Sequence, residues 1–321
     1  MEWQNRFTKL ELGSKDPLPE LMVSDLNSWN LLSVTGEDQK SYLQGQLTCD
    51  LVALDPQEST LGAHCDAKGK VLSIFRCFKH NDGYALFHHA STTASSLTEI
   101  KKYSVFSKVE LDISSDITLG VLGKNADNFI DSITSTRGNV RTVENGSAIK
   151  VEDNRWILVV DRNSIATTLD KMSSAIFVED DIWDKFDIES GIPRIVEGNQ
   201  NTQIPQAFNL QAIHGISFSK GCYTGQETVA RAKYRGTNKR SMSIVKGHIE
   251  IASDLPLELE RSVGENWRSV GTIFTHYRYT DGLAMGLIVL PNNLEQDTKF
   301  RLANQPSSIW QIVDLPYEIE E

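Results

Sequence analysis

Two β-prone segments joined by a tight turn constrain the fold of this chain more than any other local feature. Val71 to Lys79 is rich in residues that favour strands, Asn81-Asp82-Gly83 is a strong hairpin signal, and Tyr84 to His88 returns. A hairpin of this kind commits its strands to an antiparallel pair. The alternating segment Leu61 to Cys65 lies just upstream, so we expect a third strand in the same sheet.

Predicted helices interleave with these strands. Thr35-Gly36-Glu37-Asp38 has the Ser/Thr-x-x-acid pattern of a helix start. A stripe formed by Leu97, Ile100 and Tyr103 predicts a second helix, which a strand over residues 108–113 follows. Strands and helices in this order indicate an α+β domain built on an antiparallel sheet.

The rest of the chain divides into two further units. Residues 117–178 predict strands at 117–122, 148–151 and 156–161, with helices at 125–133 and 164–172. From about Lys239 onward the texture changes to short β runs separated by turns, which is typical of a small antiparallel barrel. A length of 321 residues accommodates two or three domains of ordinary size. We expect three.

Charge and apolar content exclude several classes of protein. The chain has 32 Lys and Arg against 43 Asp and Glu, a net charge of −11, which argues against a surface wrapped in nucleic acid but leaves room for a local basic face. Met1 to Lys15 lacks the apolar run of a signal peptide, and stretches such as Leu283 to Leu290 are shorter than the ~18 residues of a membrane span. We therefore expect a cytoplasmic protein without membrane contact.

Cysteine and histidine spacings predict no metal site. The four cysteines form no C-x-x-C pair, and the seven histidines show no spacing typical of metal ligands. Paired disulfides would also be unusual in a chain without an export signal. We expect reduced thiols.

The most informative segment is Lys220 to Glu227, K-G-C-Y-T-G-Q-E. Its two glycines, Gly221 and Gly225, bracket a cysteine and a tyrosine. Because glycine adopts backbone angles that other residues resist, the pattern predicts a tight loop that presents Cys222. The alternative is a surface turn with an inert, half-buried cysteine. Local chemistry does not decide between these two interpretations.

This segment, which continues as T-V-A-R-A-K-Y-R-G, resembles the signature of the YgfZ-type folate-binding proteins. That family is related to the T-protein of glycine cleavage and to mitochondrial iron–sulfur assembly factors. Other segments resemble it in the same order along most of the chain: Y-L-Q-G-Q-L-T from Tyr42, A-H-C-D-A-K-G-K from Ala63, K-K-Y-S-V-F-S-K from Lys101, D-I-E-S-G-I-P from Asp187 and I-P-Q-A-F-N-L-Q from Ile204.

The resemblance implies an aminomethyltransferase-like architecture, in which three domains form a ring around a central folate hole. The implied first domain is discontinuous and comprises residues 1–115 and 184–238. Residues 116–183 form an inserted α+β domain, and residues 239–321 form the C-terminal antiparallel β-barrel. This arrangement explains why residues 187–236 do not read as part of the middle unit.

The resemblance also implies a ligand and a role. The ligand is tetrahydrofolate or a derivative, and the family's folate-contacting tryptophans match Trp29 and Trp183, for which plain core packing is the alternative. We predict that Lys220, Tyr223 and Arg235 complete the cofactor site and that Cys222 is the functional thiol. The implied role is to support iron–sulfur enzymes, including those that thiolate tRNA, so the expected partners are such enzymes or tRNA-modifying enzymes.

The segment from Lys220 to Arg240 is unusually basic for an acidic chain. It contains six Lys and Arg and a single acid, Glu227. A solvated basic strand pair is one interpretation. The other is a field that attracts either the glutamate tail of folate or a polyanion such as tRNA. The sequence leaves these open, together with direct tRNA contact.

One departure from the glycine-cleavage relatives bears on catalysis. Where those proteins carry an aspartate shortly after a glycine turn, this chain has Ser73 and Ile74. Neither side chain can take over the electrostatic and proton-transfer role of a carboxylate. We therefore expect an accessory protein without glycine-cleavage aminomethyltransferase activity. A folate-dependent one-carbon transferase with another substrate, or a tRNA-binding module, is the alternative.

Overall fold

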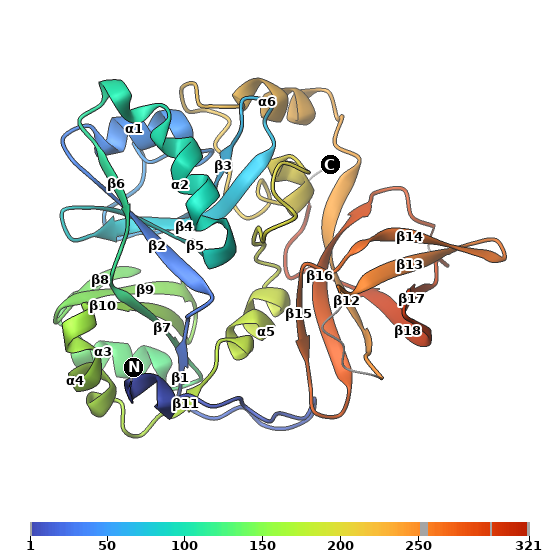
Figure 1. The fold of residues 1–321 in the computed structure, drawn as a ribbon, viewed down its shortest axis with the longest axis horizontal. Helices are drawn as coiled ribbons and strands as arrows, with labels where there is room; N and C mark the ends of the chain where they lie inside the picture. Colours follow the sequence, from blue (N-terminus) through green and yellow to red (C-terminus); the bar gives the residue numbers. More distant parts are fainter. Residues whose placement is uncertain (1, 251–255, 296, 320–321) are drawn as a thin grey trace.

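The computed structural model describes residues 2–250, 256–295 and 297–319, and these form three β-sheets with helices packed around them (Figure 1). The α+β class expected from the sequence is confirmed. Five short 3-10 segments lie between the main elements: η1 (Glu2–Arg6), η2 (Ala90–Thr92), η3 (Ser104–Phe106), η4 (Arg162–Ser164) and η5 (Pro205–Phe208). Among the described residues, no helix has the length and apolar character needed to cross a membrane.

The first sheet is antiparallel and contains the hairpin that the sequence predicted. Its strand order is β3-β4-β5-β2-β6, and helices α1 (Gln39–Gln46) and α2 (Thr93–Lys101) cover one face. Segments beyond residue 194 cover the other face, where Phe208 and Val229 pack against Ile74. The strands are β2 (Trp29–Thr35), β3 (Thr60–Cys65), β4 (Val71–His80), β5 (Gly83–His89) and β6 (Glu110–Ile113).

The second sheet has the order β11-β1-β7-β10-β9-β8 and carries α3 (Ala126–Ile133) and α4 (Ile165–Lys171) on one face. Its strands are β1 (Met22–Asp25), β7 (Ile117–Leu122), β8 (Val140–Val143), β9 (Gly146–Glu152), β10 (Arg155–Val160) and β11 (Ile176–Val178). The sequence analysis did not predict β1, which pairs with β7 and β11 and so adds an N-terminal strand to this sheet. The division into domains at residues 115, 183 and 238 stays a prediction.

The third sheet contains the short strands expected after Lys239. Its order is β14-β13-β17-β18-β12-β16-β15. Residues 270–276 belong to two strands, β14 and β15, because the first ends at Thr272 and the second begins at Thr275. The strands are β12 (Arg240–His248), β13 (Glu258–Val263), β14 (Asn266–Thr272), β15 (Thr275–Arg278), β16 (Leu283–Pro291), β17 (Phe300–Leu302) and β18 (Gln305–Val313).

Helix α5 (Asp181–Glu189) joins the three units at the centre of the molecule (Figure 1). It packs against β15, and its buried residues belong to a core cluster that also takes side chains from the first two sheets. Two terminal segments reinforce this arrangement. The N-terminal segment donates from Ser14 to Asp281 with an Oγ–Oδ2 distance of 2.6 Å, and Tyr317 donates to the Gly191 carbonyl at 2.8 Å.

The last helix, α6 (Gln226–Tyr234), lies within the basic segment. The sequence analysis described this segment as a loop or a strand pair, and the helical part is therefore a correction. Gly225 precedes the helix in the left-handed backbone region, with φ of 81°. A β-carbon on Gly225 would lie 2.5 Å from the Asp66 carbonyl oxygen, so only glycine lets this loop pack against the β3–β4 turn.

A polar layer is buried beneath α2. His64 and His88 are each 1% exposed, and neither nitrogen of His88 has a hydrogen-bond partner among the described residues. Ser73 and Ser96 in the same region satisfy each other at 3.0 Å. Because burial disfavours the charged imidazolium, the pKa of each of these two histidines is lowered to about 4. Both histidines are therefore neutral inside the fold at physiological pH.

The lowered pKa of His88 predicts a loss of stability in acid. Between pH 6.5 and about 4 the unfolded chain binds a proton at this residue and the folded chain does not, so stability falls as pH falls. One such histidine accounts for about 2 kcal/mol between pH 7 and 5. His88→Leu should therefore lose less melting temperature over this range than the unsubstituted protein does.

Exposed His248 provides the control, because His248→Leu should keep the full pH dependence. Asp25 and Asp184 act in the opposite direction, since their pKa is raised to about 6 and the folded state binds their protons first. Because all three proteins contain both aspartates, the comparison between variants cancels the aspartates' contribution to the pH dependence of stability. An equal pH dependence in all three proteins would contradict the prediction.

Candidate functional site

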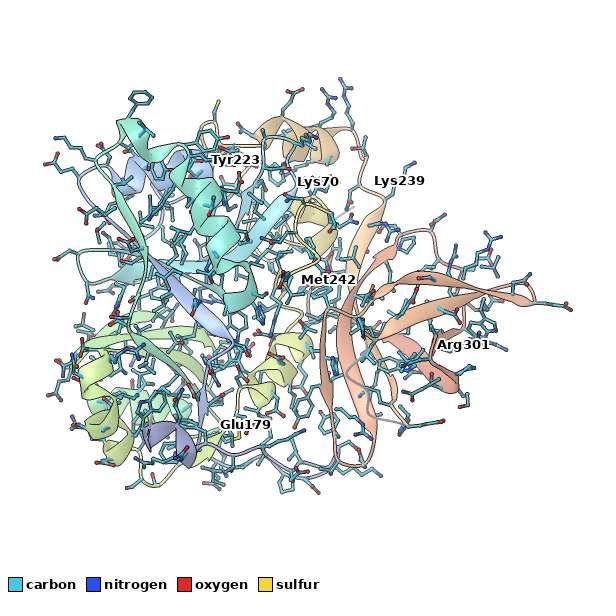
Figure 2. The ribbon with its side chains drawn as sticks, in the orientation of Figure 1. Lys70, Glu179, Tyr223, Lys239, Met242 and Arg301 are labelled. Atoms are coloured by element: carbon cyan, nitrogen blue, oxygen red, sulfur yellow. The ribbon has the colours of Figure 1, made fainter. Side chains whose placement is uncertain are left out.

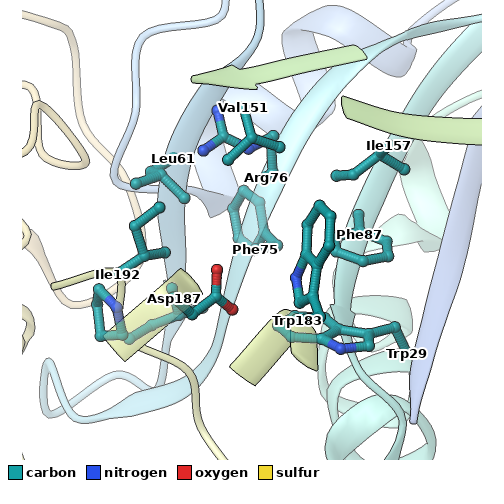
Figure 3. A pocket seen from close by; sticks show the side chains of 12 residues that line it. Trp29, Leu61, Phe75, Arg76, Phe87, Val151, Ile157, Trp183, Asp187 and Ile192 are labelled. Atoms are coloured by element: carbon teal, nitrogen blue, oxygen red, sulfur yellow. The ribbon is translucent and has the colours of Figure 1, made fainter. Parts of the chain in front are cut away.

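A cavity of about 30 Å³ lies where the first sheet, the second sheet and α5 meet (Figure 3). Its walls are mainly apolar and aromatic, with one guanidinium and one carboxylate. The lining residues are Trp29, Leu61, Ile74, Phe75, Arg76, Phe87, Val151, Ile157, Trp183, Asp187, Ile192 and Pro193.

Trp29 enters this cavity from the first residue of β2. Its ring stacks on Phe87 of the neighbouring strand, with the centroids 4.6 Å apart and an interplanar angle of 7°. The guanidinium carbon of Arg194 lies 4.6 Å from the indole centroid, and so occupies the face that Phe87 leaves. Because Phe87 and Arg194 cover both faces of the indole, Trp29 presents only the edge of its ring to the cavity. The indole Nε1 on that edge is buried and has no acceptor among the described residues.

Trp183 reaches the same cavity from α5 and is 1% exposed. The indole packs against Gly120 of β7, where an added β-carbon would lie 2.7 Å from the ring. The guanidinium carbon of Arg155 is 4.8 Å from the ring centroid. Each of the two tryptophans therefore has an arginine on it. These arginine contacts hold both indole rings in place.

A buried carboxylate connects these two arginines. Asp187 on α5 accepts from Arg155 Nη1 at 2.8 Å through one oxygen and from Arg194 Nη2 at 2.9 Å through the other. Glu152 forms an ion pair with Arg155 Nε at 2.8 Å. Asp187 is 3% exposed and Arg155 1% exposed, so the charges are compensated by each other and little by water.

Two further charges sit at this centre. Burial raises the pKa of Asp184 to about 6 although Arg194 donates to it. Burial and the neighbouring Arg155 lower the pKa of Arg76 to about 10, and Asp187 and Glu152 oppose that shift. Arg76 therefore stays cationic at neutral pH. It presents a positive charge at the cavity wall.

Three buried donors around the tryptophans lack an acceptor among the described residues: Trp29 Nε1, Arg155 Nη2 and Arg194 Nε. Buried N–H groups in folded proteins are nearly always paired with protein or with ordered water. Water or an acceptor-rich molecule would therefore complement this region. The described residues contain no cluster with the composition of a metal site.

The predicted thiol lies in a different place, beside the end of α1. Cys222 is exposed, whereas Cys49, Cys65 and Cys77 are buried. Burial raises the pKa of Cys49 to about 12 and also raises the pKa of Cys65 and Cys77, so these three remain thiols. These three cysteines are therefore packed inside the fold. Cys222 is the accessible one.

Lys220 and Tyr223, which flank Cys222 in the sequence, are both buried and hold the loop in place. Lys220 is 8% exposed, and its Nζ donates to the carbonyls of Leu47 at 2.8 Å and Cys49 at 2.7 Å. Its Nζ also lies 5.1 Å from the ring centroid of Tyr223, and burial lowers its pKa to about 8. The ammonium group is therefore turned into the protein. It does not face solvent.

The structure thus divides the predicted site residues into two groups. Trp29 and Trp183 line one cavity, while Lys220 and Tyr223 lie at the Cys222 loop and Arg235 is exposed at the end of α6. None of the last three lines the cavity, so their part in cofactor binding stays a prediction. The sequence analysis did not single out Arg155, Asp187 or Arg194. The sequence pointed only indirectly to two of them: Asp187 lies within the motif D-I-E-S-G-I-P, and Arg194 directly follows it.

Comparisons with known proteins agree with this fold. Residues 238–305 match the model of the YgfZ β-barrel domain. The chain is 52% identical to the tRNA-modifying protein YgfZ of Vibrio atlanticus over the full length of both, and 39% identical to that of Cronobacter sakazakii over 95% of each chain. The glycine cleavage aminomethyltransferase T of Bartonella henselae superposes with a TM-score of 0.70 at 13% identity, covering 92% of this chain and 86% of that one. The fold is therefore aminomethyltransferase-like, and the chain belongs to the YgfZ family.

Proposed function

We propose that this protein binds a reduced folate and supports iron–sulfur enzymes that act in tRNA modification, including thiolation. The tRNA role follows from the names of its relatives, and the folate from the fold it shares with a T-protein. The observation that carries the proposal is the set of unpaired buried donors beside the tryptophan cavity.

The residues around the cavity fit the chemistry of folate. A pterin ring offers a flat apolar surface and an edge of acceptors, which suits aromatic walls and the free Nε1 of Trp29. The benzoyl-glutamate end carries carboxylates, for which Arg76 supplies a half-buried positive charge. When bound, a reduced folate supplies the capacity to carry a one-carbon unit. The protein's own contribution is to bind and orient it.

A transfer reaction of the glycine-cleavage type lacks its carboxylate here. Ile74 lines the cavity, and Ser73, on the opposite face of the strand, bonds with Ser96. Among the described lining residues Asp187 is the single carboxylate, and both of its oxygens accept from arginines. Both oxygens are therefore already engaged in the buried ion-pair network. We therefore propose an accessory role and no aminomethyl transfer.

Cys222 is the second part of the proposal. The loop that carries Cys222 is held in place by the hydrogen bonds from Lys220 Nζ to two backbone carbonyls and by the close packing of Gly225 against Asp66. An exposed thiol on a fixed loop can meet a partner protein, exchange sulfur or contact a cluster. The three buried cysteines cannot do so without unfolding.

Tetrahydrofolate should quench the tryptophan emission of the purified protein, and calorimetry should give a matching affinity. Trp29→Phe removes the Nε1 donor and should weaken binding by about 0.5–1.5 kcal/mol, the value of one hydrogen bond. Trp183→Phe should reduce the fraction of the tryptophan emission that tetrahydrofolate quenches. Trp267→Phe, a partly exposed residue of the barrel sheet, is the control and should change neither. No quench and no heat at millimolar ligand would refute the folate site.

The protein should not replace the T-protein in glycine cleavage, because the cavity wall carries Ile74 where transfer needs an acid. The measurement is folate-dependent release of ammonia from the aminomethyl-lipoyl carrier protein, with an authentic T-protein as positive control. Turnover above the protein-free background would show that another group takes over the role of the carboxylate.

Cys222 should be alkylated first in the native protein, and Cys49, Cys65 and Cys77 only after denaturation. Cys222→Ala should abolish complementation of tRNA thiolation while its melting temperature and folate affinity stay unchanged. Cys65→Ala is the matched control, since it should lower the melting temperature and still complement. If Cys222→Ala complements fully, the mechanism lies in the folate cavity alone.

A further inference from the structure

One corner of the molecule collects basic side chains from two segments that are about 160 residues apart in sequence. The β3–β4 turn packs on the start of α6, because an added β-carbon on Gly69 would lie 2.7 Å from Thr228. The chain then runs along α6 and through residues 235–239 to β12. We call this corner the α6 platform. Its cations are Lys68, Lys70, Arg231, Lys233, Arg235 and Lys239.

Most of this charge is uncompensated. Glu227 is the one acid on the helix, and it pairs with Arg231 at 2.7 Å. Asp66 in the turn accepts from two backbone amides, those of Lys68 and Lys70. Among the described ion pairs, none involves Lys68, Lys233, Arg235 or Lys239. Four available cations on a chain of net charge −11 form a local field of the opposite sign.

An aromatic side chain stands among these cations. Tyr234 is 71% exposed at the end of α6. Phe218 supports it edge-on, with the ring centroids 6.5 Å apart, and Lys233 Nζ lies 4.0 Å from the Phe218 centroid. Tyr234 is therefore held in place while much of its ring stays open to solvent. Exposed aromatics on which bases stack, set in a basic surface, are typical of single-stranded nucleic-acid sites.

The cations of the α6 platform are spread over its surface, and this spacing determines which kind of anion the platform can bind. A small anion requires donors that converge on one point, whereas this surface extends beyond the ~13 Å length of α6 alone. Lys70 and Lys239 lie on either side of this corner, and long side chains ending in nitrogen extend from it into solvent (Figure 2). A long polyanion with stackable bases satisfies both features. We infer that the α6 platform binds RNA directly, through phosphate contacts and a base stacked on Tyr234; the choice of tRNA as probe rests on the proposed function.

The experiment measures anisotropy of a labelled, unmodified tRNA transcript with the full-length protein between 50 and 200 mM KCl. Four phosphate contacts give a slope of log K against log salt of about −3, a loss of roughly 50-fold over this range. Lys233→Gln combined with Lys239→Gln should flatten the slope by about 1.4 and weaken binding roughly 25-fold at 0.1 M salt. Tyr234→Ala should weaken binding roughly 5-fold or more with the slope unchanged.

Two matched controls come from α2 and the segment after it. Lys101→Gln combined with Lys102→Gln removes the same charge from lysines paired with Asp112 and Glu99, and Tyr103 is 51% exposed. This double variant and Tyr103→Ala should bind tRNA like the unsubstituted protein. The inference is overturned if the two double variants lose affinity equally, if the slope is near zero, or if polyglutamate or anionic lipid vesicles show the same variant pattern as tRNA.

Folate binding is measured on the same variants, so that the two ideas fail separately. Lys233→Gln with Lys239→Gln lies outside the tryptophan cavity and should bind tetrahydrofolate unchanged. Salt-dependent tRNA binding without folate binding would refute the proposed ligand and keep the platform. Folate binding with no tRNA binding would do the reverse.

Discussion

The buried carboxylate of Asp187 is the interaction on which the arrangement of this protein depends. It lies on α5, accepts from Arg155 of the second sheet, and accepts from Arg194, whose guanidinium covers Trp29 of the first sheet. One side chain thereby connects elements from two sheets and from the helix between them. Removing one member of such a buried network leaves an unpaired charge and costs about 3–5 kcal/mol. The cavity wall therefore depends on this network as much as on apolar packing.

A single strand connects the two functional regions. β4 begins just after the Asp66–Lys70 turn, which contacts Gly225 of the cysteine loop, and it continues through Ile74 and Arg76 in the cavity wall. The first sheet thus carries both the tryptophan cavity and the support of the thiol loop. Because β4 is paired on both sides, it is a rigid connection between them.

Local patterns predicted much of the fold. The hairpin at Asn81-Asp82-Gly83, the helix after Thr35 and most barrel strands lie where period and turn residues indicated. The misses have physical causes. β1 is four residues long and is stabilised by pairing with β7 and β11, partners that lie about 95 and 150 residues further along the chain. The basic run of α6 shows a weak apolar period, and its helix is anchored mainly by Val229 and Ala232 against distant segments.

The sequence by itself determined the class of fold and the family. Those properties depend on alternation, turn chemistry and motif order, which neighbouring residues carry. Tertiary structure decided that Trp29 and Trp183 share one cavity, that Arg155 and Arg194 converge on Asp187, and that Lys220 turns inward to two carbonyls. Charge pairs and cavities form between groups far apart in the chain, and their partners are chosen by packing and desolvation, which no local pattern records.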